Sequence, residues 1–254
     1  VVKGAKTCSI AKTGTTGPSP ATANLYSTVW YNLGLIHDKL GAYADAISAF
    51  NMSLELRKAL LGRDHPDVAC LLYNIGVLQM EQQLLKEATF SFREALRIRR
   101  VASAGQLNDH HVVKTLEKLA SLHKAKGNIE GALEASREVL HIQEASSDYE
   151  PMTRMKEMGI MLRSIAELHH AIGDNDAAIE NASESVRKLL SVVDMYEVKG
   201  ASAHYVEKSF DVEQLVSSLL LVGSIYHETA EPFLAHSTFQ QAVVILKKNT
   251  AVYH

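Results

Sequence analysis

Histidine is the residue of this 254-residue chain that could most readily do chemistry, because its twelve imidazoles titrate near neutral pH and can bind metal ions. Their spacing argues against a shared metal site. The pairs His110-His111 and His169-His170 are adjacent, and neighbouring residues on a helix point about 100° apart, so they do not converge on one ion. His37, His123 and His169 recur at one position of a repeated pattern, where we interpret them as half-buried spacers between helices. We therefore expect no metal site.

Other catalytic patterns are absent from the sequence. There is no Gly-rich phosphate loop, no Gly-x-Ser-x-Gly elbow and no His-Glu-x-x-His motif. Cys8 and Cys70 are the only cysteines, which excludes a disulfide-rich scaffold and a four-cysteine zinc site. We therefore expect a protein that is not an enzyme and that uses no cofactor.

The composition indicates a soluble helical protein. Hydrophobic residues make up 46% and charged residues 22%, and the small numbers of glycine (14) and proline (5) argue against an all-β fold. The net charge of −3 gives no positive field for nucleic acid, and the longest apolar stretch, residues 215–226, is too short to span a membrane. The absence of a secretion signal favours a cytoplasmic location, with an organelle interior after removal of a transit peptide as the alternative.

The N-terminal segment differs from the rest of the chain. Residues 1–22 are rich in Gly, Pro, Ser and Thr, and we expect them to be flexible. The chain starts with Val1-Val2 rather than Met, so we expect a processed product or part of a longer protein.

From residue 23 to residue 252 the apolar spacing is helical and repeats. In each unit a small residue of one helix is followed twelve residues later by an alanine of the next, which allows two antiparallel helices to cross closely. Gly41, Gly127 and Gly173 suit the turn between them. The expected repeats are approximately 24–60, 66–104, 110–146, 152–196 and 209–250. The small and alanine positions are 34/46, 76/88, 120/132, 166/178 and 223/235.

Two details of the repeat boundaries carry further expectations. Asp64 is a good helix N-cap, and Pro66, Pro151 and Pro232 lie where helices should begin. The last interval is about fifteen residues longer than the first, so we expect long helices there, joined by a mobile connection at residues 198–203.

The series Trp30, Leu33, Gly34, Gly41, Tyr43, Ala46 and Phe50 resembles the tetratricopeptide repeat. The 42-residue step, the linker 61–69 and the segments Leu54-Glu55-Leu56-Arg57 and Leu96-Arg97-Ile98-Arg99 resemble the kinesin light chain subclass. The resemblance covers about residues 24–248 and implies an all-α, right-handed superhelical solenoid of about five helix-turn-helix repeats. The chain departs from the pattern at Ser136 and Ala182, where an aromatic residue is usual, and at Ala230, where the turn glycine belongs.

The resemblance implies a protein-protein interaction scaffold or adaptor whose first helices line a concave, peptide-binding groove. Asn32 and Asn74 are similar to an asparagine that, in this subclass, hydrogen-bonds the backbone of an extended peptide, although they could also be merely exposed polar residues. Lysines and arginines in the third and fourth repeats suit an acidic segment, whereas Glu117 and Glu167 favour a solvated face of mixed charge. The expected groove residues are Tyr31, Asn32, Leu35, Tyr73, Asn74, Val77, Lys114, Lys118, Lys124 and Arg163.

The alternative function is that of a structural or assembly subunit held through its convex face or its ends. Repeat arrays usually end in a polar capping helix, and the sequence stops soon after the last expected helix. A homo-oligomer formed through the uncapped C-terminal repeat is therefore a further expectation, beside binding to a protein or peptide partner of unknown identity.

Overall fold

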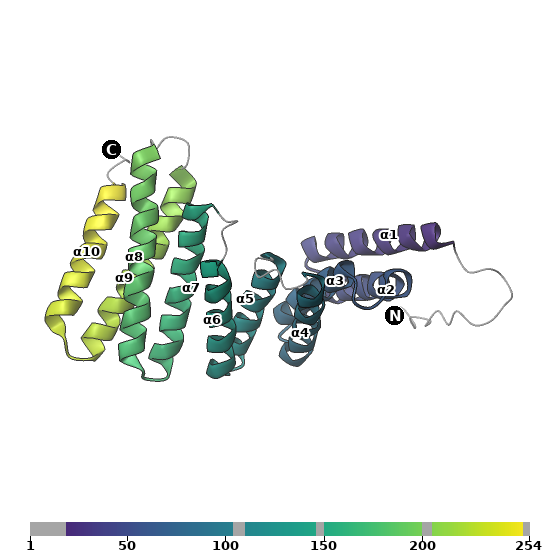
Figure 1. Ribbon diagram of the computed structural model, residues 1–254, viewed down its shortest axis with the longest axis horizontal. Helices are drawn as coiled ribbons and strands as arrows, with labels where there is room; N and C mark the ends of the chain where they lie inside the picture. Colours follow the sequence, from purple (N-terminus) through teal and green to yellow (C-terminus); the bar gives the residue numbers. More distant parts are fainter. Residues whose placement is uncertain (1–18, 104–109, 146–149, 200–204, 251–254) are drawn as a thin grey trace.

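The computed structural model describes residues 19–103, 110–145, 150–199 and 205–250, and in these ranges it contains ten α-helices and no strand (Figure 1). Consecutive helices pair, and the five pairs stack in one row, which confirms the predicted all-α solenoid of five repeats. The helices are α1 (Pro20–Lys39), α2 (Tyr43–Leu61), α3 (Pro66–Glu81), α4 (Leu85–Ala102), α5 (His110–Ala125), α6 (Ile129–Ala145), α7 (Pro151–Ala171), α8 (Asn175–Lys199), α9 (Tyr205–Glu228) and α10 (Pro232–Thr250).

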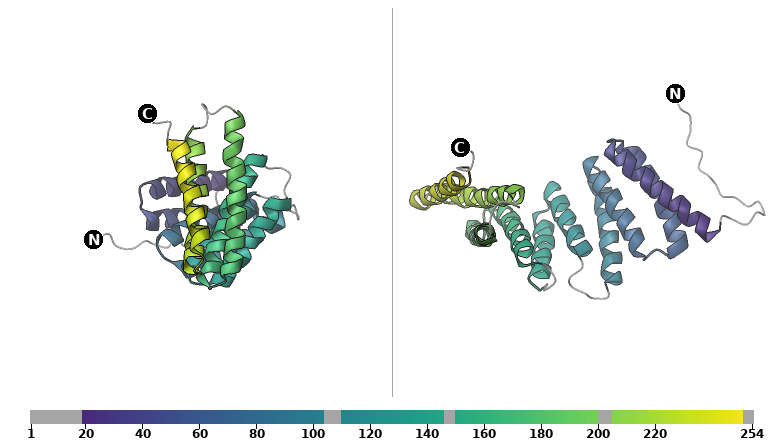
Figure 2. Two further views of the ribbon diagram at one scale, coloured as in Figure 1. Left: turned by 90° about the vertical axis from the view of Figure 1, so that its left-hand side faces the viewer. Right: turned by 90° about the horizontal axis from the view of Figure 1, so that it is seen from above.

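The odd-numbered first helices lie closer together than the even-numbered second helices. First helices of neighbouring repeats meet at α3–α5 and at α7–α9, and no comparable contact joins two second helices in the described ranges. Hollows of about 470 to 500 Å³ lie instead between α2 and α4, between α4 and α6, and between α8 and α10, each floored by the first helix in between. The array therefore curves toward its first helices, and Figure 2 shows the row from its end and from above.

The two helices of a repeat cross where a glycine faces a phenylalanine sixteen residues later. A Cβ atom added to Gly34 would lie 2.6 Å from the ring of Phe50, and one added to Gly76 would lie 2.9 Å from the ring of Phe92. Gly223 and Phe239 repeat the arrangement in the fifth repeat, at 2.5 Å. Only glycine leaves room for the aromatic ring at this crossing.

In the third and fourth repeats, smaller residues occupy the same crossing. Ala120 stands sixteen residues before Ser136, and Ala166 stands sixteen before Ala182, and all four are buried. Where the second helix lacks the aromatic residue, the first helix therefore has alanine in place of glycine. The alanines twelve residues after the small position, such as Ala46, are also fully buried.

The turn inside every repeat contains a residue in the left-handed conformation at the same register. Gly41, Gly127 and Gly173 have φ angles of 72°, 70° and 81°, which confirms their predicted role. Gln83 and Ala230 adopt φ angles of 60° and 61° at the equivalent positions of the second and fifth repeats. The turn geometry is thus kept even where glycine is lost.

Prolines begin the helices α1, α3, α7 and α10, as predicted for Pro66, Pro151 and Pro232. The prediction that Asp64 caps α3 is wrong. Because Pro66 occupies the first helical position, the cap falls on His65, whose Nδ1 accepts a hydrogen bond of 3.2 Å from the backbone N–H of Asp67. The carboxylate of Asp64 pairs with Arg97 of α4 instead.

Long helices absorb the extra residues of the last interval, as expected: α8 has 25 residues and α9 has 24. The connection expected to be mobile falls mostly on residues 200–204, which lie outside the described residues, as does the expected flexible segment up to residue 18. Helix α1 begins at Pro20, where the side chain of Ser19 accepts a hydrogen bond from the N–H of Thr22.

Candidate peptide-binding groove

Tyr31 and Tyr73 are packing residues on the inner, first-helix face. The ring of Tyr31 lies 5.7 Å from the ring of Phe50, and the guanidinium of Arg57 lies 5.1 Å over it. Tyr73 repeats this arrangement one repeat later with Phe92 and with a guanidinium at 4.8 Å. Each half-buried tyrosine is therefore held between an aromatic ring and a cation.

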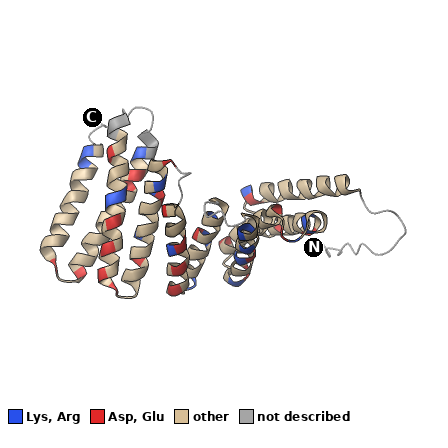
Figure 3. Ribbon diagram, in the orientation of Figure 1, with Lys and Arg blue, Asp and Glu red and all other residues tan. Residues whose placement is uncertain are grey.

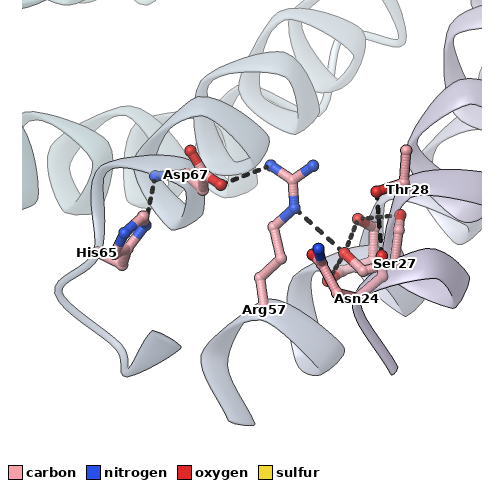
Figure 4. A network of polar contacts seen from close by, with 7 residues as sticks. Asn24, Ser27, Thr28, Arg57, His65 and Asp67 are labelled. Atoms are coloured by element: carbon pink, nitrogen blue, oxygen red, sulfur yellow. Dashed lines mark hydrogen bonds and ion pairs between the residues drawn. The ribbon is translucent and has the colours of Figure 1, made fainter. Parts of the chain in front are cut away.

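Arg57 and Arg99 have a structural role between repeats that the sequence did not reveal. The Nε of Arg57 donates to Ser27 Oγ at 3.1 Å, and its Nη1 lies 3.6 Å from the carboxylate of Asp67 at the start of the next first helix (Figure 4). Ser27 is itself hydrogen-bonded to Ser53 at the buried crossing of α1 and α2. Arg57 thus ties its own repeat to the following one.

Arg99 makes the equivalent tie from the second repeat to the third. It is only 6% exposed, and its Nη1 donates to the backbone carbonyl of His111 at 2.8 Å and to the hydroxyl of Thr115. The two arginines occupy the last residue of the Leu54-Glu55-Leu56-Arg57 and Leu96-Arg97-Ile98-Arg99 segments. These segments mark the two arginines in the sequence, but their spacing does not identify the groups that each guanidinium contacts.

Asn32 and Asn74 lie next to the two tyrosines on the first-helix face. Asn32 is exposed and Asn74 is half-buried, and neither side chain makes a hydrogen bond or ion pair to another residue of the described chain. Leu35 and Val77 follow one turn later and are half-buried. The expected residues of α1 and α3 therefore lie together on one face. In each of the two repeats they are a tyrosine held by packing, an asparagine without a hydrogen-bond partner in the described chain, and an apolar side chain.

The middle of the first-helix face carries acids among its cations. Lys114, Glu117 and Lys118 share α5, and Glu157 lies on the adjacent part of α7. Burial, and then the negative charge of Glu157, raises the pKa of Glu117, while the two lysines act in the opposite direction. Burial likewise raises the pKa of Glu157, which accepts a hydrogen bond of 3.4 Å from Gln143.

The other two expected cations are engaged in ties between repeats. The Nζ of Lys124 lies 2.6 Å from the carboxylate of Glu167, joining α5 to α7. Arg163 donates to Gln214 Oε1 at 2.7 Å, joining α7 to α9, while its Nε is buried without a hydrogen-bond partner. Figure 3 shows Lys, Arg, Asp and Glu interleaved over these central helices. This part of the first-helix face is therefore of mixed charge rather than uniformly basic.

Of the three histidines predicted as half-buried spacers, His37 is half-buried, and His123 and His169 are buried at the turns. His123 is 9% exposed and its Nδ1 lies 2.9 Å from the side-chain nitrogen of Asn128, while the Nδ1 of His169 lies 3.0 Å from Asp174. In the described ranges, no group of three His, Cys, Asp or Glu side chains could hold a metal ion. None of the helices described combines the length and the apolarity needed to cross a membrane.

Comparison with known proteins identifies the repeats. A family model described as tetratricopeptide repeat matches residues 25–100, which span the first two helix pairs. No protein with a curated function matches the chain.

Several solved structures share the fold. The nearly identical TPR-like repeats of a candidate kinesin light chain from Podosopora anserina are 16% identical, with a TM-score of 0.60 over 91% of this chain and 97% of that one. BtubC (BKLC) from P. vanneervenii is 17% identical, with a TM-score of 0.67 over 93% and 85%. YrrB, a TPR protein with an unusual peptide-binding site, is 13% identical, with a TM-score of 0.52 over 85% and 84%. Residues 25–100 therefore match the tetratricopeptide repeat, and the chain has the fold of kinesin light chain-like repeat arrays.

Proposed function

We propose that the chain is a non-enzymatic scaffold that binds an extended peptide or protein segment across α1, α3 and α5, with Asn32 and Asn74 hydrogen-bonded to the backbone of that segment. Tetratricopeptide repeats support protein interaction in general, and the similar fold of YrrB accommodates a peptide-binding site. The observation that carries the proposal is the pair of equivalent amides, one repeat apart, that have no partner within the described chain.

The chemistry of this face suits a peptide backbone. A carboxamide both donates and accepts hydrogen bonds, so it can pair with the N–H or the C=O of a peptide unit. Tyr31 and Tyr73 are already held by Phe50, Phe92 and the two arginines, so little side-chain freedom is lost when a ligand rests on them. Leu35 and Val77 offer apolar contact for side chains of the segment.

The charged residues further along set the expected ligand chemistry. We expect Lys114 and Lys118 to attract an acidic side chain of the bound segment, since their charges act on Glu117 without forming a close ion pair within the described chain. Lys124 and Arg163 contribute by keeping α5, α7 and α9 in register through Glu167 and Gln214. A segment with an uncharged stretch followed by acidic residues fits the whole groove best.

Selection of peptides followed by a variant tests the proposal. A random peptide library displayed on phage is selected against the chain, and the enriched peptides are measured by fluorescence anisotropy. The variant Asn32→Ala with Asn74→Ala is expected to lose about tenfold to a hundredfold in affinity, because each lost hydrogen bond is worth about 1 kcal/mol or somewhat more.

The matched control removes an amide elsewhere. Asn51 is exposed on α2, away from the first-helix face, so Asn51→Ala is expected to bind the selected peptides normally. Circular dichroism and urea denaturation confirm that both variants are folded. Undiminished binding by the folded double variant would overturn the role of the two amides.

The alternative, a subunit held through its convex face, is favoured by one observation. Phe90 on α4 is 70% exposed between two hollows of about 500 Å³, with Lys86 and Arg93 beside it. An exposed aromatic ring flanked by cations is a common element of protein interfaces. Phe90→Ala would abolish association with a partner that binds this face and would leave selected groove peptides bound, so the two functions are separable in one binding assay.

A further inference from the structure

The outer face of α1 exposes apolar side chains whose counterparts in every other first helix are buried. Tyr26, Val29 and Ile36 are 56%, 62% and 55% exposed. At the equivalent positions the other first helices carry residues that are at most 8% exposed. These residues are Val68, Leu71 and Leu78 in α3, Val112, Thr115 and Leu122 in α5, Met158, Met161 and Leu168 in α7, and Leu215, Ser218 and Ile225 in α9.

The buried counterparts lie under the second helix of the preceding repeat. Each first helix from α3 to α9 packs on the helix before it. Arg99 of α4 bonds to Thr115 of α5 in this interface, and Ser185 of α8 lies 2.9 Å from Ser218 of α9. Helix α1 therefore presents the same surface that four other helices use to receive a second helix.

The outer face of α10 presents the opposite half of this interface. Phe239 is partly exposed, whereas Phe50 and Phe92 are 1% and 0% exposed. Val243 is 46% exposed, whereas its equivalents Leu54 and Leu96 are 5% and 7% exposed. In the first and second repeats these residues belong to hydrophobic clusters shared with the next first helix.

Both end faces also lack charged residues. Helix α1 has no Lys, Arg, Asp or Glu between Pro20 and Ile36, and α10 has none between Pro232 and Leu246, in a chain that is 22% charged (Figure 3). Charged residues are depleted at the cores of protein interfaces. An uncharged face offers no complementarity to a strongly acidic or basic partner, but it suits another uncharged helix face.

We propose that the chain associates head to tail, with α10 of one copy packing on α1 of a second copy as α2 packs on α3 within the chain. The two helices belong to the repeats at opposite ends of the long axis, so α10 cannot pack on α1 of the same molecule (Figure 1). The contact is between different surfaces, so copies add in one direction into an open filament or a closed ring. This association does not depend on the peptide binding proposed for the first-helix face.

Sedimentation velocity and light scattering over a range of concentrations test the proposal. The mass of the unmodified chain is expected to rise with concentration beyond that of two chains. The α1-face variant carries Val29→Glu and Ile36→Glu, and the α10-face variant carries Val243→Glu. Each variant alone is expected to be monomeric, because an unpaired carboxylate buried in the contact weakens it on the order of a hundredfold.

Mixing the two variants gives the decisive measurement. An equal mixture retains one intact α10 face and one intact α1 face, so it is expected to form a species of two chains and nothing larger. A control places the same glutamate away from both end faces. Ile172 is 53% exposed at the turn between α7 and α8, inside the array. Ile172→Glu is expected to assemble like the unmodified chain.

Three results would overturn the proposal. They are an unmodified chain that stays monomeric at every concentration, an α1-face variant that still dimerises through α10 alone, and a mixture that does not form the two-chain species. Because the substituted residues are exposed in the monomer, the variants are expected to unfold at the same urea concentration as the unmodified chain, which separates lost association from lost folding.

Discussion

The backbone of Gly34 lies so close to the ring of Phe50 that a methyl group there would stand 2.6 Å from two ring carbons. The second and fifth repeats keep the pair, and the third and fourth replace both members by Ala120 with Ser136 and by Ala166 with Ala182. The sizes of the two residues are therefore adjusted jointly in each repeat, which accounts for where the aromatic residue is lost.

Gly34→Ala is expected to destabilise the protein by about 2 kcal/mol, because the added Cβ forces the ring and the two helices apart. Urea denaturation followed by circular dichroism measures the loss. The combined variant Gly34→Ala with Phe50→Ala provides the control. Once the ring is gone, Gly34→Ala is expected to be neutral or to stabilise by up to about 1 kcal/mol, since alanine is the better helix former. Equal effects of Gly34→Ala with and without the ring would contradict this account.

Arg99→Ala is expected to cost about 2 to 4 kcal/mol, because it removes the hydrogen bonds of a buried guanidinium to the His111 carbonyl and to Thr115, and its contact with the Tyr73 ring. Arg99→Lys keeps the charge but loses the planar group, and it should recover less than half of that stability. Arg57→Ala, at a more exposed site, is expected to have the smaller effect. Thermal unfolding of the three variants compares them, and an Arg99→Lys variant as stable as the unmodified chain would refute the role of the planar group.

Ala230→Gly is expected to stabilise the fifth repeat by about 0.5 to 1 kcal/mol. Alanine at a φ of 61° is strained, and glycine relieves the strain at a smaller entropic cost. Gln83→Gly should behave in the same way in the second repeat. The reverse change Gly41→Ala is the matched control and should destabilise. Amide hydrogen exchange of α9 and α10 localises the effect of Ala230→Gly, and faster exchange there would contradict the prediction.

Glu117→Gln is expected to stabilise the protein at neutral pH. The pKa of Glu117 is raised in the folded state, so between the unfolded value of 4.5 and the folded pKa the native state binds more protons, and stability falls as the pH rises. Glutamine removes that loss, and the difference between the two proteins should vanish as the pH falls below 4.5. Urea midpoints from acid to neutral pH measure it. Glu87→Gln, an exposed substitution on α4, controls for the chemical change itself.

The fold follows closely from the sequence because each repeat restates the same local rules. The small residue, the alanine twelve residues later and the left-handed turn glycine predicted helix pairs that the structure contains. The direct contact of Gly34 with Phe50 was less evident, because spacing along a chain does not identify which of two facing residues touches the glycine. Asp64 was misassigned because Pro66, two residues further along, fixes the cap position on His65.

The candidate site was predictable in position and less so in chemistry. Helical periodicity placed Asn32, Asn74, Leu35 and Val77 on one face, since that depends only on spacing. The charge of the central groove depends on which side chains of different repeats meet, and neither the Lys124–Glu167 pair nor the arginine ties can be derived from one helix alone. Contacts between repeats depend on how the helix pairs stack in three dimensions, which the sequence pattern of one repeat does not determine.

The ties made by Arg57 and Arg99 end at the third repeat. At the equivalent position Gln143 reaches Glu157 through a longer hydrogen bond of 3.4 Å, and the seam between α6 and α7 is also bridged by a contact of 3.2 Å between Arg137 Nη2 and His169 Nε2. An uncharged amide thus takes the place that a guanidinium has in the two seams before it. We expect this seam to bend more readily than those two, which would let the first-helix face change its curvature to admit ligands of different length without disturbing the crossing of any helix pair.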